Sequence, residues 1–143
     1  MNNPKEPLKI TAFASGRGSN LEAILKNIAA GQLNARVMAV ISNKSTAGAL
    51  ETARKQGIPT FHISRLQFQS GRDYEEKLLS TLKKHDTELI VLAGYMKKIP
   101  SSVVRAYKHR ILNIHPALLP SFGGQGLYGH LVHEAVLKYG CKV

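Results

Sequence analysis

The chain has 143 residues, and its 20 Lys and Arg against 9 Asp and Glu give a formal charge of +11 with histidine neutral. This length suits one domain, and 43% apolar residues are enough for a core and too many for a disordered chain. No apolar run approaches the roughly 20 residues of a membrane span, and the single cysteine, Cys141, excludes an internal disulfide and a cysteine-based zinc site. The basic excess indicates an anionic partner, which is nucleic acid, phospholipid or a phosphorylated or carboxylated small molecule.

Short apolar strands alternate with helical segments along the chain. Residues 1–7 are polar, carry no apolar signal region and are expected to form a flexible leader. Strands are expected at residues 8–14, 35–41, 60–63, 89–94 and 110–114, and helices at residues 21–28, 47–56, 73–84, 100–107 and 130–138. This alternation predicts an α/β domain over residues 8–143, with a mostly parallel, doubly wound sheet and flanking helices. Such sheets bind ligands beyond the carboxyl ends of their strands, and the cysteine content favours a reducing, cytoplasmic setting.

The first expected strand ends in residues 15–20 (SGRGSN), directly before a helix. Glycines let backbone N–H groups approach an anion, and the amino end of the helix carries positive partial charge. The segment departs from a dinucleotide fingerprint because Leu21 replaces the third glycine, and it lacks the Gly-Lys-Ser/Thr of a Walker loop. A phosphate cradle for a mononucleotide fits better. The alternative, which stays open here, is an ordinary turn in which Ser19 or Asn20 caps the helix.

Asn113 and His115 stand two residues apart at the end of the last expected strand. Residues two apart in a strand point to the same face, and Pro116 keeps His115 extended. Imidazole can accept or donate a proton near neutral pH, and a carboxamide N–H can stabilise an oxyanion. The pair therefore suits acyl transfer through a tetrahedral intermediate. The alternative is a hydrogen-bonded polar pair without a catalytic role.

Residues 92–99 (LAGYMKKI) form the third strand end, where a buried strand opens into a loop with apolar and basic side chains. Such a loop can line a slot for a flat aromatic ligand, although these residues alone favour a routine connection. His130 and His133 lie three apart on an expected helix, without the spacing of a zinc protease or a third ligand. No metal site is therefore expected.

Four segments together resemble the phosphoribosylglycinamide formyltransferase family. They match that family in order and spacing: residues 15–24 (SGRGSNLEAI), 41–43 (ISN), 91–96 (VLAGYM) and 112–122 (LNIHPALLPSF). The resemblance runs over residues 8–143, and its specificity comes from the combination of segments. It implies a Rossmann-like formyltransferase fold and the transfer of a formyl group from 10-formyltetrahydrofolate to the amine of glycinamide ribonucleotide, in purine biosynthesis.

The same resemblance implies roles for particular residues. Asn113 is expected to bind the formyl oxygen as it becomes an oxyanion, and His115 to act as acid and base. The ribonucleotide phosphate is expected at Gly18, Ser19 and Asn20. The folate is expected to meet residues around one pocket: Arg72, Leu92, Met96, Lys97, Lys98, Ile99, Val104, Ile111 and Asn113. Two anionic substrates then account for the basic charge. No metal, nucleic acid or membrane is expected as a partner, and whether the protein forms a homodimer stays open.

The family's pattern continues for several dozen residues beyond residue 143 and includes an aspartate that pairs with the histidine. A carboxylate beside histidine favours the imidazolium and so helps to supply a proton. Asp73 and Asp86 belong to an earlier helix and its end, so neither replaces that aspartate. We therefore expect a chain truncated within the fold at its C-terminus, which keeps much of the nucleotide site but has little or no transferase activity.

Alternatives to this activity come from other enzymes and from binding modules. Formyltetrahydrofolate deformylase shares the Asn-x-His arrangement but usually carries an N-terminal regulatory domain, whereas about seven residues precede the first strand here. Methionyl-tRNA formyltransferase has a different first loop, and Leu21 disfavours an NAD-dependent oxidoreductase. A basic nucleic-acid-binding module is the non-enzyme alternative, which the scattered basic residues and the lack of an aromatic platform disfavour.

Overall fold

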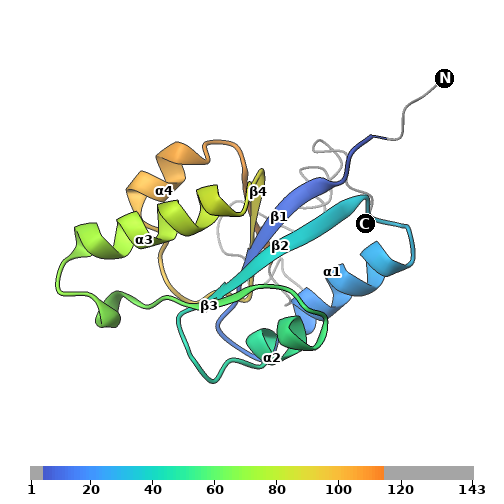
Figure 1. Cartoon of the computed structure of the whole chain (residues 1–143), viewed down its shortest axis with the longest axis horizontal. Coiled ribbons are helices and arrows are strands. Elements are labelled where there is room, and N and C mark those ends of the chain that lie inside the picture. The colour runs from blue at the N-terminus through green and yellow to red at the C-terminus, as the bar shows by residue number, and fades with distance from the viewer. Residues whose placement is uncertain (1–4, 115–143) are drawn as a thin grey trace, which may run out of the picture.

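In the described part of the chain, five parallel strands form one sheet in the order β3-β2-β1-β4-β5 (Figure 1). The computed structural model describes residues 5–114, where the strands are β1 (Leu8–Phe13), β2 (Ala35–Ser42), β3 (Thr60–His62), β4 (Leu89–Ala93) and β5 (Ile111–Ile114). The helices are α1 (Ser19–Ala29), α2 (Gly48–Lys55), α3 (Gly71–Lys84) and α4 (Ser101–Ala106), with a 3-10 helix η1 (Arg65–Gln67) before α3. The predicted α/β fold is confirmed, and each element expected in this range lies within two residues of its predicted ends. The helix expected at residues 130–138 lies outside the described residues.

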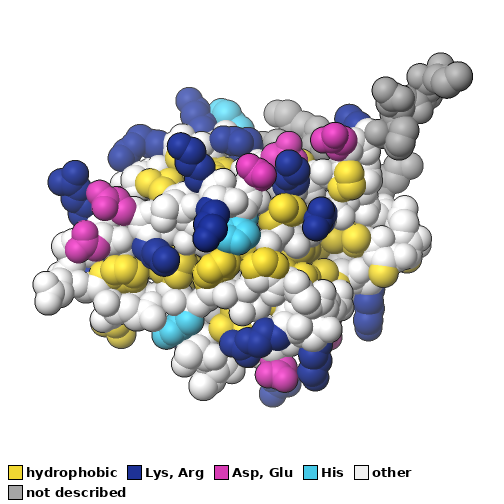
Figure 2. Space-filling model, in the orientation of Figure 1, with side chains coloured by type: hydrophobic (Ala, Val, Ile, Leu, Met, Phe, Trp, Pro, Cys, Tyr) yellow, Lys and Arg dark blue, Asp and Glu magenta, His cyan; other side chains and the backbone are white. Residues whose placement is uncertain are grey.

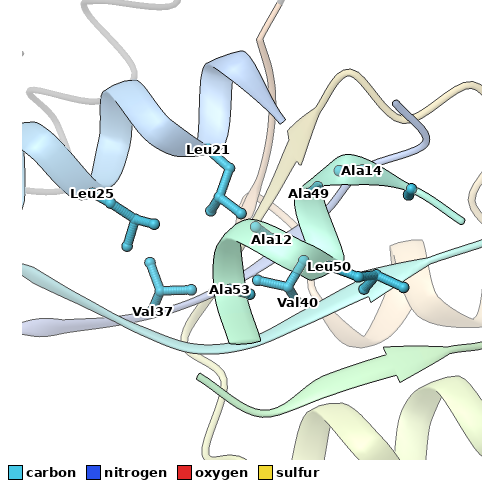
Figure 3. Close-up of a cluster of buried hydrophobic side chains, with 10 residues drawn as sticks. Ala12, Ala14, Leu21, Leu25, Val37, Val40, Ala49, Leu50 and Ala53 are labelled. Atoms are coloured by element: carbon cyan, nitrogen blue, oxygen red, sulfur yellow. The ribbon is translucent and has the colours of Figure 1, made fainter. Parts of the chain in front are cut away.

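The helices cover both faces of the sheet, with α1 and α2 on one face and α3 and α4 on the other (Figure 1). Leu21 and Leu25 of α1 and Leu50 of α2 point toward Val37 and Val40 of β2, as Figure 3 shows. On the opposite face, the buried cluster draws on β1, β2, β4, α3 and α4. Because the central strands are buried on both sides, they consist of nearly continuous apolar residues.

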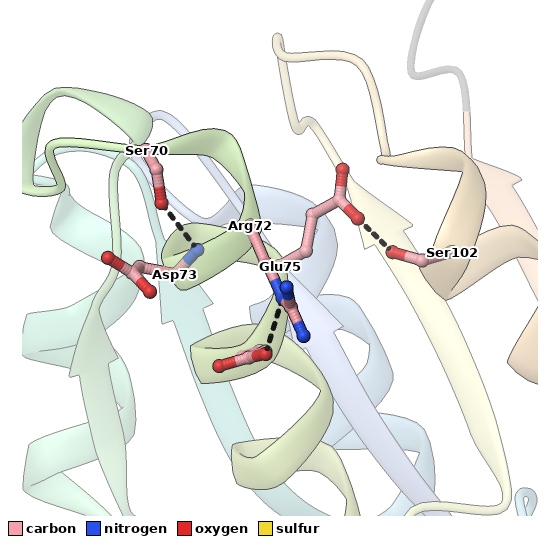
Figure 4. Close-up of polar contacts among 6 residues, drawn as sticks. Ser70, Arg72, Asp73, Glu75 and Ser102 are labelled. Atoms are coloured by element: carbon pink, nitrogen blue, oxygen red, sulfur yellow. Dashed lines mark hydrogen bonds and ion pairs between the residues drawn. The ribbon is translucent and has the colours of Figure 1, made fainter.

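Polar side chains fix the start of α3 and its contact with α4 (Figure 4). The hydroxyl of Ser70 accepts a hydrogen bond from the Asp73 N–H at 3.1 Å and so caps the helix. Ser102 of α4 donates a hydrogen bond to Glu75 Oε2 at 2.6 Å. This contact anchors α4, which follows directly after the loop that leaves β4.

The chain leaves the central strands β1 and β4 toward opposite sides of the sheet. β1 leads through α1 to β2, whereas β4 leads through α4 to β5. The two strands end level with each other, because Phe13 pairs with Leu92. A sheet whose order reverses in this way forms a crevice beyond the strand ends, which is a common ligand site. We call the loops there, residues 14–18, 43–47 and 94–100, the carboxyl edge of the sheet.

Candidate functional site

Ser15 connects the three loops of the carboxyl edge. Its hydroxyl donates a hydrogen bond to Asn43 Oδ1 at 2.5 Å and accepts one from the Met96 N–H at 2.9 Å. Its own N–H donates to the Gly94 carbonyl at 3.1 Å. Because the Ser15 residue is only 3% exposed, these bonds are shielded from water. The loops after β1, β2 and β4 are therefore held against one another at the point where the sheet order reverses.

The loop after β1 presents the amino end of α1 without a side-chain cap. The N-cap residue is Gly18, with φ +89°, and among the described residues no side chain caps this helix end. The predicted cap by Ser19 or Asn20 is therefore wrong, because both residues lie inside the helix, whereas an ordinary turn stays an alternative to the phosphate cradle. The first N–H groups of an α-helix have no acceptor within the helix. The N–H groups at residues 19–21 can therefore point toward an anion, as the predicted phosphate cradle requires.

Glycine at positions 18 and 48 allows this loop to lie directly against the start of α2. A Cβ atom at Gly18 would lie 2.7 Å from the Ala49 Cα, and one at Gly48 would lie 2.7 Å from the Arg17 carbonyl oxygen. The Ala49 N–H donates to the Gly16 carbonyl at 3.1 Å and closes the contact. Gly18 is thus required by backbone packing and by its left-handed φ, independently of any ligand.

Asn113 lies on the α3–α4 face of the sheet, beside Leu92. Strand β5 pairs with β4 so that Asn113 faces Leu92 and Ile111 faces Ile90. Since side chains alternate along a strand, Asn113 and Ile111 share one face, and Ile111 and Leu92 pack against the α3–α4 cluster. The half-buried Asn113 therefore adjoins two residues of the predicted folate wall. His115 lies outside the described residues.

The remaining predicted folate residues near β4 divide between solvent and core. Met96 is 78% exposed, and Lys97 and Lys98 are exposed on the same loop. Val104, on α4, is 46% exposed, whereas Ile99 is buried in the cluster beneath α3 and α4. Met96, Lys97, Lys98 and Val104 are thus accessible to a ligand, while Ile99 supports the loop from below.

Arg72 lies in the first turn of α3. Its Nε donates to Glu76 Oε1 at 3.2 Å, and its side chain is 87% exposed (Figure 4). An exposed pair at this helical spacing contributes only a few tenths of a kcal/mol, roughly 0.2–0.5, so a ligand can displace it readily. The predicted contact between Arg72 and folate stays a prediction.

The carboxyl edge is basic. Its loops carry Arg17, Lys44, Lys97 and Lys98, all exposed, and no acidic residue. The two ion pairs found in the described part of the chain lie within α2 and within α3, so neither neutralises these four cations. Figure 2 shows that the Lys and Arg side chains of the visible face are spread out and do not form a single stripe. The unbalanced charge at the loops favours small anions at this edge.

Tyr95 packs beneath the loop after β4. Its ring meets Phe13 edge-on, with 5.2 Å between centroids, and its hydroxyl lies 3.5 Å from the Tyr74 hydroxyl. Burial raises the pKa of Tyr95 well above its ordinary value, and the neighbouring Tyr74 raises it further. Tyr95 therefore stays neutral at physiological pH and acts as a rigid aromatic support for the loop.

The range from residue 5 to residue 114 holds no group of three or more His, Cys, Asp or Glu side chains that could bind a metal ion. No helix in that range is long and apolar enough to cross a membrane. His130, His133 and Cys141 lie outside the described residues.

Comparison with known proteins places these features in a family. The family model named formyl transferase matches residues 8–143. The chain belongs to the formyl transferase family. A phosphoribosylglycinamide formyltransferase from Bacillus subtilis is 35% identical over 135 residues, which cover 94% of this chain and 69% of that protein.

Other relatives of this chain are longer. A chloroplastic phosphoribosylglycinamide formyltransferase from Arabidopsis thaliana is 43% identical over 94% of the chain, which spans 46% of that relative. The solved structure of a phosphoribosylglycinamide formyltransferase from Coxiella burnetii matches with a TM-score of 0.75 and 41% identity, over 94% of this chain and 61% of that one. A formyltetrahydrofolate deformylase from Pseudomonas syringae, at 23% identity and a TM-score of 0.70, shares the fold.

The structure of this chain adds residues to the candidate site. Ser15 and Asn43 hold the loops together, and Arg17 and Lys44 bring positive charge to them. Their position directly after β1 and β2 is the sequence signal that could have singled them out, because ligands gather beyond these strand ends. Their contacts could not have been foreseen, since the partners come from different loops.

Proposed function

We propose that the chain forms the ribonucleotide- and folate-binding part of a phosphoribosylglycinamide formyltransferase. Such an enzyme moves a formyl group from 10-formyltetrahydrofolate to the amine of glycinamide ribonucleotide, a step of purine biosynthesis. The observation that carries the proposal is the junction at Ser15, where the glycine loop before α1 meets the loop after β4. Relatives named phosphoribosylglycinamide formyltransferase support it.

In this proposal, the ribonucleotide phosphate binds at Gly18, Ser19 and Asn20. The uncapped amino end of α1 supplies N–H donors and positive partial charge there. Gly18 lets the loop lie close to α2, so that these donors keep a fixed direction. Arg17 and Lys44 attract the dianion to the edge without an acidic neighbour in the loops.

The folate is proposed to lie across the α3–α4 side of the carboxyl edge. Half-buried Leu92 and Ile111 give an apolar wall, and exposed Met96 and Val104 extend it. The pterin ring needs such a wall together with a few polar groups that fix its orientation. Ile99 is proposed to border this pocket from the core. Three basic side chains are proposed to face the anionic tail of the folate: Arg72, Lys97 and Lys98.

The reaction balances without a metal ion or a redox step. The amine nitrogen of glycinamide ribonucleotide attacks the formyl carbon, and the formyl oxygen becomes an oxyanion that accepts a hydrogen bond from the Asn113 carboxamide. The tetrahedral intermediate then breaks its bond to folate N10. The amine loses one proton and N10 gains one, and His115 is proposed to carry this proton as acid and base.

A single-turnover experiment tests the function. Protein in excess over 10-formyltetrahydrofolate is mixed with glycinamide ribonucleotide, so that even slow transfer gives a measurable product, and the Bacillus subtilis relative serves as the positive control. Formylglycinamide ribonucleotide and tetrahydrofolate are the expected products. Asn113→Ala should slow their formation about 10²–10³-fold and His115→Ala about 10²–10⁴-fold. Unchanged rates in both variants would refute the assignment of these residues.

The products also separate the alternatives. Release of free formate with no effect of the ribonucleotide would identify a deformylase. Tight, salt-sensitive binding of RNA or DNA that is indifferent to both small molecules would identify a nucleic-acid-binding module. The cytoplasmic location and the homodimer stay predictions. Fractionation of cells tests the location, and sedimentation of the purified protein tests the oligomeric state.

A further inference from the structure

The hydrogen bonds of Ser15 cross between segments that are far apart in the chain. Asn43 lies 28 residues away and Met96 lies 81 residues away. One buried hydroxyl thus serves the loop proposed for the phosphate, the loop after β2 and the loop proposed for folate. Gly16 and Gly94 on either side of this junction carry no side chain, and Gly94 adopts a φ of +76° that glycine tolerates.

We propose that Ser15 and Asn43 are positioning residues that couple ribonucleotide binding at residues 16–20 to the order of the folate loop, residues 94–100. The inference rests on the proposed function and adds a link between its two binding sites. Asn43 Oδ1 accepts a hydrogen bond from the Ser15 hydroxyl, which orients this hydroxyl so that its lone pair faces the Met96 N–H. The conformational order of the backbone at Met96 therefore depends on the position of the loop after β1.

The coupling has a thermodynamic basis. An anion bound at the amino end of α1 restricts the loop that begins at Ser15. This restriction extends to Gly94 and Met96 through two hydrogen bonds of Ser15, while the bond to Asn43 fixes its hydroxyl. Folate that meets an already ordered loop loses less conformational entropy on binding. By linkage, each ligand then strengthens the binding of the other by the same factor.

Amide hydrogen exchange followed by NMR tests the coupling on the whole chain without folate. In the wild type, saturating glycinamide ribonucleotide should slow exchange at residues 16–21 and also at Met96. In Ser15→Ala, Met96 should exchange about tenfold faster in the free protein, because its N–H loses its acceptor. The ribonucleotide should still slow residues 16–21 in this variant but should no longer slow Met96.

Ser42→Ala is the matched control. Ser42, at the end of β2, is buried like Ser15, but within residues 5–114 its hydroxyl accepts a hydrogen bond only from the nearby Lys44 N–H, at 3.1 Å. This variant should keep the effect of the ribonucleotide on Met96. Asn43→Ala, at a half-buried position, should lose the effect, and the double variant Ser15→Ala/Asn43→Ala should behave like either single variant. If Ser15→Ala does not fold, Asn43→Ala carries the test.

Three results would contradict the coupling or the proposed function, and they can be told apart. Ribonucleotide that protects residues 16–21 but not Met96 in the wild type would overturn the coupling and leave the proposed function standing. Full protection of Met96 in both Ser15→Ala and Asn43→Ala would also overturn it. Ribonucleotide that protects neither loop in the wild type would overturn the proposed function, and the coupling with it.

Discussion

The two edges of the sheet use charge in different ways. At the carboxyl edge, four exposed cations stand in the loops with no acidic residue. At the opposite, amino edge, a cavity of about 530 Å³ opens between the ends of α3 and α4. Its lining mixes both signs of charge with apolar side chains: Lys9, Leu79, Lys83, Asp86, Thr87, Glu88, Ala106, Tyr107 and Arg110.

Polar groups at the amino edge serve the fold. Glu88 accepts a hydrogen bond from the Lys9 N–H at 2.8 Å, and the Arg110 guanidinium lies 4.8 Å from the centre of the Tyr107 ring. The buried hydroxyls of Thr11 and Thr87 lie 2.7 Å apart and join β1 to the turn before β4. The cavity at the amino edge is therefore surrounded by polar groups that already have partners within the fold.

The largest effect on stability is expected at the carboxyl edge. Gly18→Val places side-chain atoms against the Ala49 backbone and forces a β-branched residue to a φ of +89°. We expect a loss of about 2–4 kcal/mol in the free energy of unfolding, measured by urea denaturation. Gly16→Ala is the control, since its Cβ would meet nothing within 4 Å, and it should change stability by under about 0.5 kcal/mol. Equal stability of the two variants would show that the loop does not pack on α2 as described.

The next largest loss of stability is expected at the amino edge. Thr87→Val removes the hydrogen-bond partner of the fully buried Thr11 hydroxyl and should cost about 1–3 kcal/mol. Adding Thr11→Val should recover part of this loss, because no polar group of the pair then remains buried. Calorimetric affinity for glycinamide ribonucleotide should stay unchanged in both variants. A large loss of affinity would mean that the two edges are not independent.

Charge reversal compares the edges directly. Lys44→Glu should weaken ribonucleotide binding about fivefold at low salt, and less at high salt because ions screen exposed charges. Lys83→Glu makes the same change beside the amino-edge cavity and should leave the affinity unaltered. Titration calorimetry at two salt concentrations measures both. An equal loss of affinity in the two variants would show that the overall charge of the protein, and no local site, attracts the ribonucleotide.

The smallest effect concerns how the free energy of unfolding changes at alkaline pH. Burial raises the pKa of both Tyr95 and Tyr107; Tyr74 reinforces the shift at Tyr95, whereas Arg110 opposes it at Tyr107. Above about pH 10 the unfolded chain loses tyrosine protons that the folded chain keeps, so the free energy of unfolding falls as pH rises. Tyr95→Phe should flatten this decline more than Tyr107→Phe. Chemical denaturation between pH 8 and 11 gives the slope of the free energy of unfolding against pH. Identical slopes in the two variants would contradict a larger pKa shift at Tyr95 than at Tyr107.

Local sequence patterns predicted most of the architecture. The helix expected at residues 73–84 is present and buries Tyr74, Leu78 and Leu82, and the apolar strand at residues 89–93 lies inside the sheet. Strand ends rich in glycine and polar residues indicated where a site should form. The placement of Asn113 beside Leu92 also follows from strand alternation once the strand order is known.

The sequence by itself determined the alternation of strands and helices and the kinds of side chain at each strand end, because both depend on residues close together in the chain. The tertiary structure decided which loops touch. It showed that Gly18 packs on α2, and that Ser15 joins Asn43 and Met96. These contacts span 28 and 81 positions, so no local periodicity encodes them, and they exist only after the sheet has set the three strand ends side by side.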